Sequence, residues 1–226
     1  MPGSDPGHHG LVSQGESQQP GAVNTVRTTG IYCRSGCVAR PLPKNVEVML
    51  SPAAAEVAGF RPCLRCRPDR LPVALAASTA PPVVTEALVQ ICGGYLDDHC
   101  ESDLGRMLGV SARHLRRLFA EAVGATPAQV ALSRRAHFAR SLLDDTDLPM
   151  TQVAFAAGFG SIRRMNDVMQ EVFKFSPTAL RAKRRRPACS SDRRWDHHLL
   201  SSMVAADLAQ LVDAHSHAGG GGTEVA

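Results

Sequence analysis

Apolar residues recur at helical spacing through the second half of the chain. Leu115, Leu118 and Phe119 fall on one face of segment 112–123, and charged side chains occupy its other faces. Ser111 stands directly before this segment, where an N-cap residue is expected. Similar patterns predict helices over 103–108, 126–143 and 162–173, and a helix with a glycine turn over 150–159. Helical spacing also covers 84–96, where Gly93 and Gly94 interrupt it. We therefore predict an all-α domain over 83–186.

Two parts of this domain repeat the same order of a helix, a glycine turn and a second helix. Gly109 precedes the second helix 112–123, and Gly158 precedes the second helix 162–173. This order is typical of a helix-turn-helix unit, whose second helix enters the major groove of DNA. We therefore predict double-stranded DNA as the partner, although a solvated helix face is the alternative interpretation for the arginines. The candidate DNA contacts are Ser111, Arg113, His114, Arg116, Arg117, Ser161, Arg163, Arg164 and Asn166.

The rest of the chain divides by composition. The short apolar run 46–50 predicts a strand, and Ser51 with Pro52 predicts the start of a short helix that ends at Gly59. These elements place a small α+β domain at 26–70. Residues 1–25 are rich in Gly, Pro, Ser and Gln and predict a disordered tail. We expect a linker at 71–82 and a C-terminal tail at 187–226 that can form a short helix.

Composition narrows the class of protein. Hydrophobic residues make up 44% and aromatic residues only 4%, which favours helical cores built from Leu, Val, Ala and Met. The net charge of +4 is compatible with a nucleic-acid partner. No apolar run approaches the roughly 18 residues of a membrane span, and the N-terminus lacks a signal-peptide pattern. We expect no membrane partner and a cytoplasmic location, where cysteines are thiols or metal ligands.

Four of the seven cysteines form two pairs near the N-terminus. Three residues separate Cys33 from Cys37, and two separate Cys63 from Cys66. This spacing predicts a four-thiolate site for one Zn²⁺ per chain. A domain this small needs such a metal to hold it folded. From the spacing alone, a purely structural zinc site is the favoured interpretation.

The residues around these cysteines resemble the Ada family. RTTGIYCR at 27–34, PKNV at 43–46 and VAGFRPCLRCRPD at 57–69 are similar to its N-terminal zinc domain. SARHLRRLF, VAFAAGF and FKFSP, which begin at residues 111, 153 and 173, resemble the AraC-type helix-turn-helix domain that follows it. The resemblance implies a mainly α fold, in which a small α+β zinc domain precedes an all-α AraC-type domain with two helix-turn-helix units.

The resemblance also implies DNA repair in the alkylation damage response. Cys33 would accept a methyl group irreversibly from a methylphosphotriester in DNA, which makes the protein a single-turnover methyltransferase. Cys37, Cys63 and Cys66 would remain structural zinc ligands. Thr29, Arg40 and Arg65 match positions that approach the DNA backbone in relatives.

Repair would be coupled to sequence-specific DNA binding and transcriptional activation through RNA polymerase, with a monomer favoured. The chain lacks a Pro-Cys-His-Arg motif, so we expect neither alkylguanine methyltransferase nor glycosylase activity. The alternative function is a non-enzymatic AraC-type transcription regulator whose zinc site is purely structural.

Overall fold

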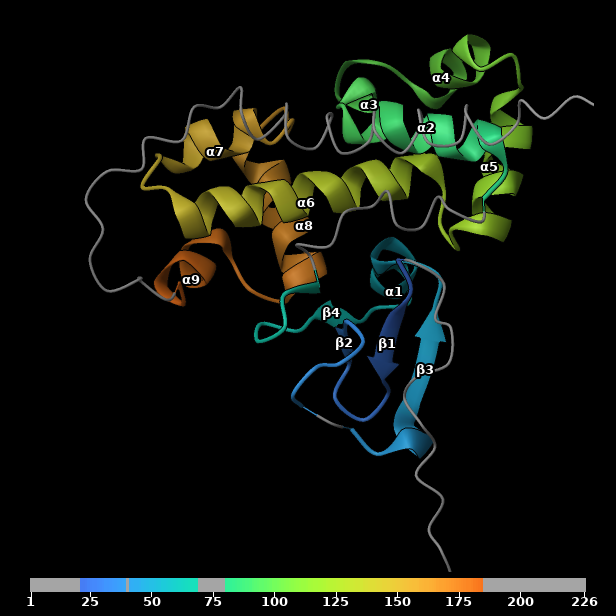
Figure 1. Ribbon diagram of the computed structural model, residues 1–226. Helices are drawn as coiled ribbons and strands as arrows, with labels where there is room; N and C mark the ends of the chain where they lie inside the picture. The colour runs from blue at the N-terminus through green and yellow to red at the C-terminus, as the bar shows by residue number, and fades with distance from the viewer. Residues whose placement is uncertain (1–20, 40, 69–79, 185–226) are drawn as a thin grey trace, which may run out of the picture.

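A computed structural model describes residues 21–39, 41–68 and 80–184. Figure 1 shows a small sheet with one short helix against it, and a larger helical part on the other side of that helix. The mainly α fold and the preceding α+β part agree with the sequence-based prediction. The predicted contact Arg40, the linker residues 71–79 and the C-terminal tail 187–226 lie outside the described residues.

A four-stranded sheet forms the first part, with strand order β3-β1-β2-β4. Its strands are β1 (Val23–Val26), β2 (Ile31–Cys33), β3 (Val46–Met49) and β4 (Arg61–Pro62). β1 pairs antiparallel with β2 and β3, whereas β2 and β4 run parallel. The prediction of a disordered tail up to residue 25 is wrong at its end, because Val23 and Thr25 are fully buried in β1. A strand of only four residues, one of them Asn24, gives little periodic signal beside a polar segment.

One short helix covers the sheet. A 3₁₀ turn (Pro43–Asn45) leads into β3, and α1 (Pro52–Val57) follows. The hydroxyl of Ser51 accepts a hydrogen bond from the backbone N–H of Ala54 at 3.1 Å, as expected for an N-cap residue. The predicted strand over 46–50 and the predicted helix after Ser51 are both confirmed.

The second part consists of helices. They are α2 (Pro82–Cys92), α3 (Tyr95–Asp98), α4 (Glu101–Met107), α5 (Ala112–Ala122), α6 (Pro127–Asp145), α7 (Met150–Ala156), α8 (Ile162–Phe173) and α9 (Pro177–Ala182). The interruption of the helical pattern at Gly93 and Gly94 is confirmed, because α2 ends before Gly93 and Gly94 adopts a φ of +91° between α2 and α3. Helix α2 begins at Pro82, so the predicted linker extends one residue too far. No described helix is long and apolar enough to cross a membrane.

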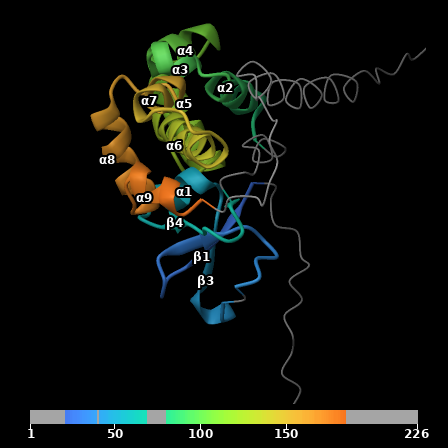
Figure 2. The same cartoon turned by 90° about the vertical axis from the view of Figure 1, so that its left-hand side faces the viewer.

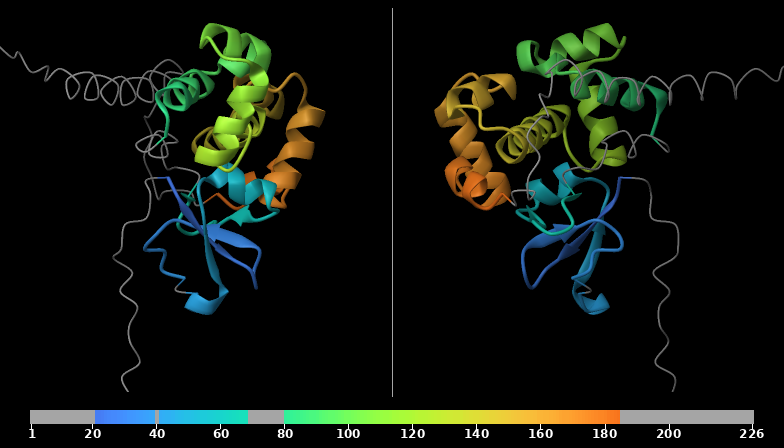
Figure 3. Two further views of the ribbon diagram at one scale, coloured as in Figure 1. Left: turned by 90° about the vertical axis from the view of Figure 1, so that its right-hand side faces the viewer. Right: turned by 60° about the vertical axis from the view of Figure 1, so that its left-hand side comes forward.

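Helix α6 is the element on which both helical cores are built (Figures 1 and 2). Its first half contributes Val130 and Ala131 to a core with α2, α4 and α5. Its second half contributes Ala139 and Leu142 to a core with α7, α8 and α9. The turned views in Figure 3 show α5 and α8 on different sides of α6, with α1 between α6 and the sheet. The two predicted helix-turn-helix units are therefore two halves joined by one helix.

A glycine makes the turn inside each unit. Gly109 between α4 and α5 has a φ of +70°, and Gly158 between α7 and α8 has a φ of +81°. A side chain is strained in this left-handed region. At Gly158 a β-carbon would also lie 2.6 Å from the Asp97 carboxylate. Both turns therefore favour glycine for steric reasons.

Lys174 provides a test of backbone strain. It ends α8 with a φ of +61° and a ψ of +23°, where glycine is the favoured residue. We expect Lys174→Gly to raise the free energy of unfolding by about 1 kcal/mol, because the β-carbon clash is relieved. Urea unfolding measures this change. Lys174→Ala is the control, since it removes the same charge and keeps the β-carbon; an equal gain in both variants would contradict the explanation.

Candidate metal centre and nucleic-acid interface

Parallel pairing of β2 with β4 brings the two cysteine pairs together. Cys33 is the last residue of β2, and Cys63 directly follows β4. The backbone N–H of Cys63 donates to the carbonyl of Tyr32 at 2.9 Å and fixes the register of the two segments. Cys37 lies in the loop after β2, and Cys66 lies three residues after Cys63. Ligands thirty residues apart in the chain therefore lie side by side because of one short strand pairing.

The four sulfur atoms fit one zinc ion. They all lie within 4.8 Å of one another. Tetrahedral zinc with Zn–S bonds of about 2.3 Å would place its sulfur ligands roughly 3.8 Å apart. The predicted zinc site is confirmed as a four-sulfur cluster that can hold a single Zn²⁺. Of the other described cysteines, Cys92 ends α2 and the exposed Cys100 precedes α4.

Electrostatics explain why this cluster needs a cation. Burial, together with the charges of Cys63 and Cys66, raises the pKa of the Cys33 thiol well above its ordinary value. Burial also raises the pKa of Cys66 to about 12, against the effect of a hydrogen bond from the Arg34 backbone. Burial opposes ionisation of Cys63 as well, but backbone N–H groups of Cys66 and Arg65 donate to its sulfur and lower its pKa. A bound metal supplies the positive charge that keeps all four sulfurs ionised.

The residues around the cluster differ in their access to solvent. Cys33 is only 4% exposed, and Cys63 and Cys66 are 7% and 9% exposed. Arg34 and Arg65 are exposed next to these cysteines in the chain. Thr29, in the turn between β1 and β2, is also exposed, and its Oγ1 lies 3.4 Å from the carbonyl of Val26. Two of the three predicted backbone contacts, Thr29 and Arg65, are thus on the surface.

Most of the predicted contacts on α5 and α8 are on the surface. The exposed residues are Arg113, Arg116, Arg117, Arg163, Arg164 and Asn166, and His114 is half-buried. Ser111 and Ser161 are N-caps, since their hydroxyls accept from the N–H groups of His114 and Arg164 at 3.2 and 3.1 Å. Each serine therefore fixes the start of a helix whose first turns display basic side chains.

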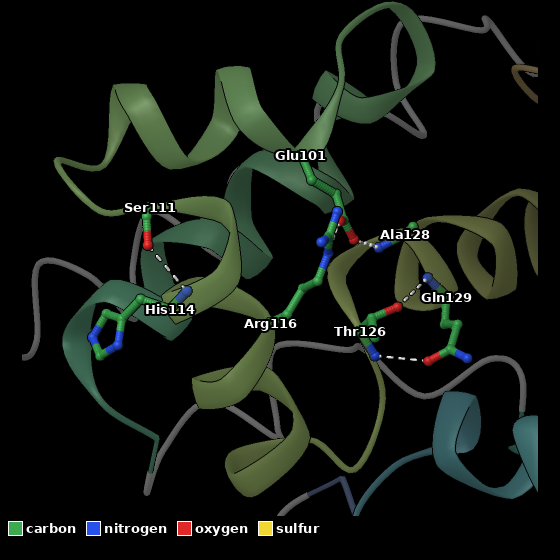
Figure 4. Close-up of polar contacts among 7 residues, drawn as sticks. All are labelled: Glu101, Ser111, His114, Arg116, Thr126, Ala128 and Gln129. Atoms are coloured by element: carbon green, nitrogen blue, oxygen red, sulfur yellow. Dashed lines mark hydrogen bonds and ion pairs between the residues drawn. The ribbon is translucent and has the colours of Figure 1, made fainter.

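Arg116 has an intramolecular partner that the sequence does not reveal. Its guanidinium forms an ion pair with Glu101 at the start of α4, and Glu101 also accepts from the N–H of Ala128 at 2.9 Å (Figure 4). Thr126 and Gln129 complete a capping box at the same end of α6 (Figure 4). Glu101 therefore ties α4, α5 and α6 together, and Arg116 is engaged in positioning α5. Glu101 and Arg116 are 15 residues apart, and no periodic pattern relates them.

The fold and the site define a class of protein: a four-cysteine metal-binding module joined to a helix-turn-helix domain with two units. The metal binding domain of Ada matches residues 14–69, and a helix-turn-helix domain matches residues 104–183. The chain belongs to the Ada family.

Three curated relatives show how much of such proteins this chain spans. It is 43% identical over 162 residues to the "Probable bifunctional transcriptional activator/DNA repair enzyme AlkA" of Mycobacterium tuberculosis, covering 71% of this chain and 33% of that protein. It is 36% identical over 109 residues to the bifunctional transcriptional activator/DNA repair enzyme Ada of Escherichia coli, covering 46% of this chain and 28% of that protein. Against AdaA of Bacillus subtilis the identity is 26%, covering 60% of this chain and 63% of the relative. The chain thus spans about a third of the first relative.

Solved structures are also similar in sequence. An AraC-type transcriptional regulator from Chromobacterium violaceum is 31% identical, with 47% of this chain and 96% of that chain covered and a TM-score of 0.43. The methylated N-ADA/DNA complex is 34% identical, with 54% and 89% covered and a TM-score of 0.23.

Metal content tests the ligand set. We expect the purified chain to hold one zinc ion and Cys37→Ser or Cys66→Ser to lose most of it, because three sulfurs bind zinc more weakly than four. Native mass spectrometry measures the stoichiometry. Cys100→Ser is the matched control, since Cys100 is exposed and lies in the helical part. Full zinc content in the Cys66 variant would contradict the assignment.

Proposed function

We propose that this protein repairs methylphosphotriesters in DNA by moving the methyl group to Cys33, and that the same chain activates transcription through its helix-turn-helix units. The observation that carries the proposal is the four-sulfur cluster flanked by exposed arginines, in one chain with two helices, α5 and α8, whose first turns carry exposed arginines. Double-stranded DNA is the partner of both parts. Activation involves RNA polymerase, and one chain is sufficient for binding.

The transfer is a single displacement at carbon. The sulfur of Cys33 attacks the methyl carbon, an S–C bond forms, and the bond from that carbon to the phosphate oxygen breaks. The electron pair of the broken bond stays on oxygen and restores an ordinary phosphodiester. Because metal binding keeps the sulfur as a thiolate, no general base is needed. The thioether that forms is stable, so each chain reacts once.

Transfer also changes the charge of the module. A thioether replaces one thiolate, so the site loses one negative charge. Residues 27–70 contain eight Lys and Arg against three Asp and Glu, and this segment is therefore basic. Removing negative charge near DNA phosphates strengthens binding. Repair of damage would thereby become a signal that the helix-turn-helix units deliver to promoters.

A second function is supported by the burial of Cys33. A thiol that is 4% exposed is typical of a structural ligand, whereas methyl transfer requires the DNA methyl group to reach the sulfur. Under this alternative the protein is a non-enzymatic AraC-type regulator with a structural zinc. Under the main proposal, DNA binding has to displace part of the chain around Cys33. Only the main proposal produces a methylated Cys33, so this product distinguishes the two functions.

Intact mass separates the two functions. We expect the zinc-loaded protein to gain the mass of one methyl group after incubation with DNA that carries methylphosphotriesters, and peptide mapping to place it on Cys33. Unmethylated DNA of the same sequence is the control. An unchanged mass with folded, zinc-loaded protein would contradict methyl transfer and favour the structural role.

DNA affinity tests the exposed arginines. We expect Arg113→Ala and Arg163→Ala each to weaken binding to duplex DNA about fivefold at fixed salt, which corresponds to about 1 kcal/mol for a lost contact. Fluorescence anisotropy measures the affinity. Lys183→Ala removes the same charge from the exposed end of α9 and should change it less. An equal loss in all three variants would mean that net charge alone governs binding.

A further inference from the structure

His137 joins the cysteine module to the helical part. It lies on α6, and its side chain is 12% exposed. Its Nε2 lies 2.5 Å from Oε1 of Glu56 on α1 and 3.3 Å from the hydroxyl of Tyr32 on β2. Its ring also packs edge-on against Phe173 at the end of α8, with centroids 5.4 Å apart. One side chain therefore contacts the module from one side and the second predicted DNA-reading helix from the other.

The contact with Tyr32 leads directly to a metal ligand. Tyr32 is fully buried, and its hydroxyl donates to Glu56 at 2.6 Å. Cys33 is the next residue of the same strand. Glu56 is itself only 7% exposed, and a buried carboxylate is costly unless its hydrogen bonds are satisfied. His137 and Tyr32 satisfy it, so the position of β2 depends on a donor from the helical part.

A second contact connects the other end of the cysteine cluster to α6. Arg67 follows Cys66, and its guanidinium forms an ion pair with Asp144 near the end of α6. Asp144 also pairs with the buried Arg140 at 2.9 Å. Arg67 has a φ of +49°, an uncommon backbone conformation for a side chain. The segment that carries Cys66 is thus attached to the same helix as the segment that carries Cys33.

Further contacts make these junctions part of a packed interface. The hydroxyl of Ser51 donates to the carbonyl of Val123 at 2.8 Å, in a buried position. Ala53 of α1 belongs to the core formed by α2, α5 and α6. Arg61 of β4 lies over the ring of Phe175, just beyond α8, at 6.0 Å. The module is therefore held against the helical part by apolar, polar and charged contacts together.

We propose that the helical domain completes the metal centre: His137 and Asp144 of α6 are positioning residues that hold the segments carrying Cys33 and Cys66. Zinc occupancy is therefore coupled to the junction, by which we mean the packing of the cysteine module against α6 and the end of α8. Outer residues that orient metal ligands change metal affinity by about 10–100-fold when they are removed. Coupling between two sites is reciprocal, so zinc release must in turn loosen the junction. This inference rests on zinc binding and is independent of methyl transfer.

Zinc affinity of the full chain tests the first half of the coupling. We expect His137→Leu to weaken zinc binding about tenfold in competition with a chromophoric chelator. His137→Gln should recover much of that affinity, because its amide can donate to Glu56. The charge-transfer spectrum of the cobalt-loaded chain should shift with His137→Leu, since the sulfur ligands are less well held. Asp97→Asn is the matched control, because it removes the ion pairs of Arg134 and Arg135 on α6 without touching the module.

Hydrogen exchange of the wild-type chain tests the reverse effect, that of zinc on the junction. This measurement does not depend on the folding of any variant. We expect zinc removal to speed exchange at the end of α8, around Val172 and Phe173, and to leave α3 and the start of α4 unchanged. A zinc affinity of His137→Leu within twofold of the wild type, or an equal loss in Asp97→Asn, would overturn the proposal. Unchanged exchange at α8 would overturn it independently. Neither readout uses methylated DNA, so a failure of the proposed repair function would be seen separately.

Discussion

Helix α6 is the constraint on which the arrangement of this protein depends. Its 19 residues contribute to both helical cores, and its side toward the sheet contacts α1. Burial of apolar side chains on several faces of one helix leaves little freedom for the elements around it. The spacing of the two helix-turn-helix units and the placement of the cysteine module therefore follow from the same helix. Any change that moves α6 acts on all three.

The cysteine cluster illustrates how burial and charge oppose each other. Burial protects Cys33 but raises the pKa of its thiol, so the cluster requires a metal ion to hold several thiolates together. Exposed Arg34 and Arg65 lie next to ligands in the chain and provide positive charge at the surface. The same burial that makes the site stable also limits access to the sulfur. The two proposed functions use the same four sulfur ligands. Methyl transfer in addition requires DNA to reach the sulfur of Cys33, whereas a structural zinc site does not.

Much of the local structure could be predicted from the sequence. The serine caps, the glycine turns and the apolar spacing predicted α1, α5 and α8 close to their observed bounds. The cysteine spacing predicted the metal cluster. Strand β1 and helix α9 were missed, because short elements carry too few residues for a periodic pattern. Arg116 was predicted as a DNA contact, and its ion pair with Glu101 could not be anticipated from residues 15 apart.

The sequence by itself determined the classes of residue and their local geometry: which positions cap helices, which make turns, and which four sulfurs can share a metal. Those features depend on neighbours within a few residues along the chain. Only the tertiary structure decided that Tyr32, Glu56 and His137 meet, because they are separated by 24 and 81 residues and come from three elements. Such contacts result from the packing of whole elements, in which no single residue type signals its partner. The attachment of the metal module to α6 is a property of the fold.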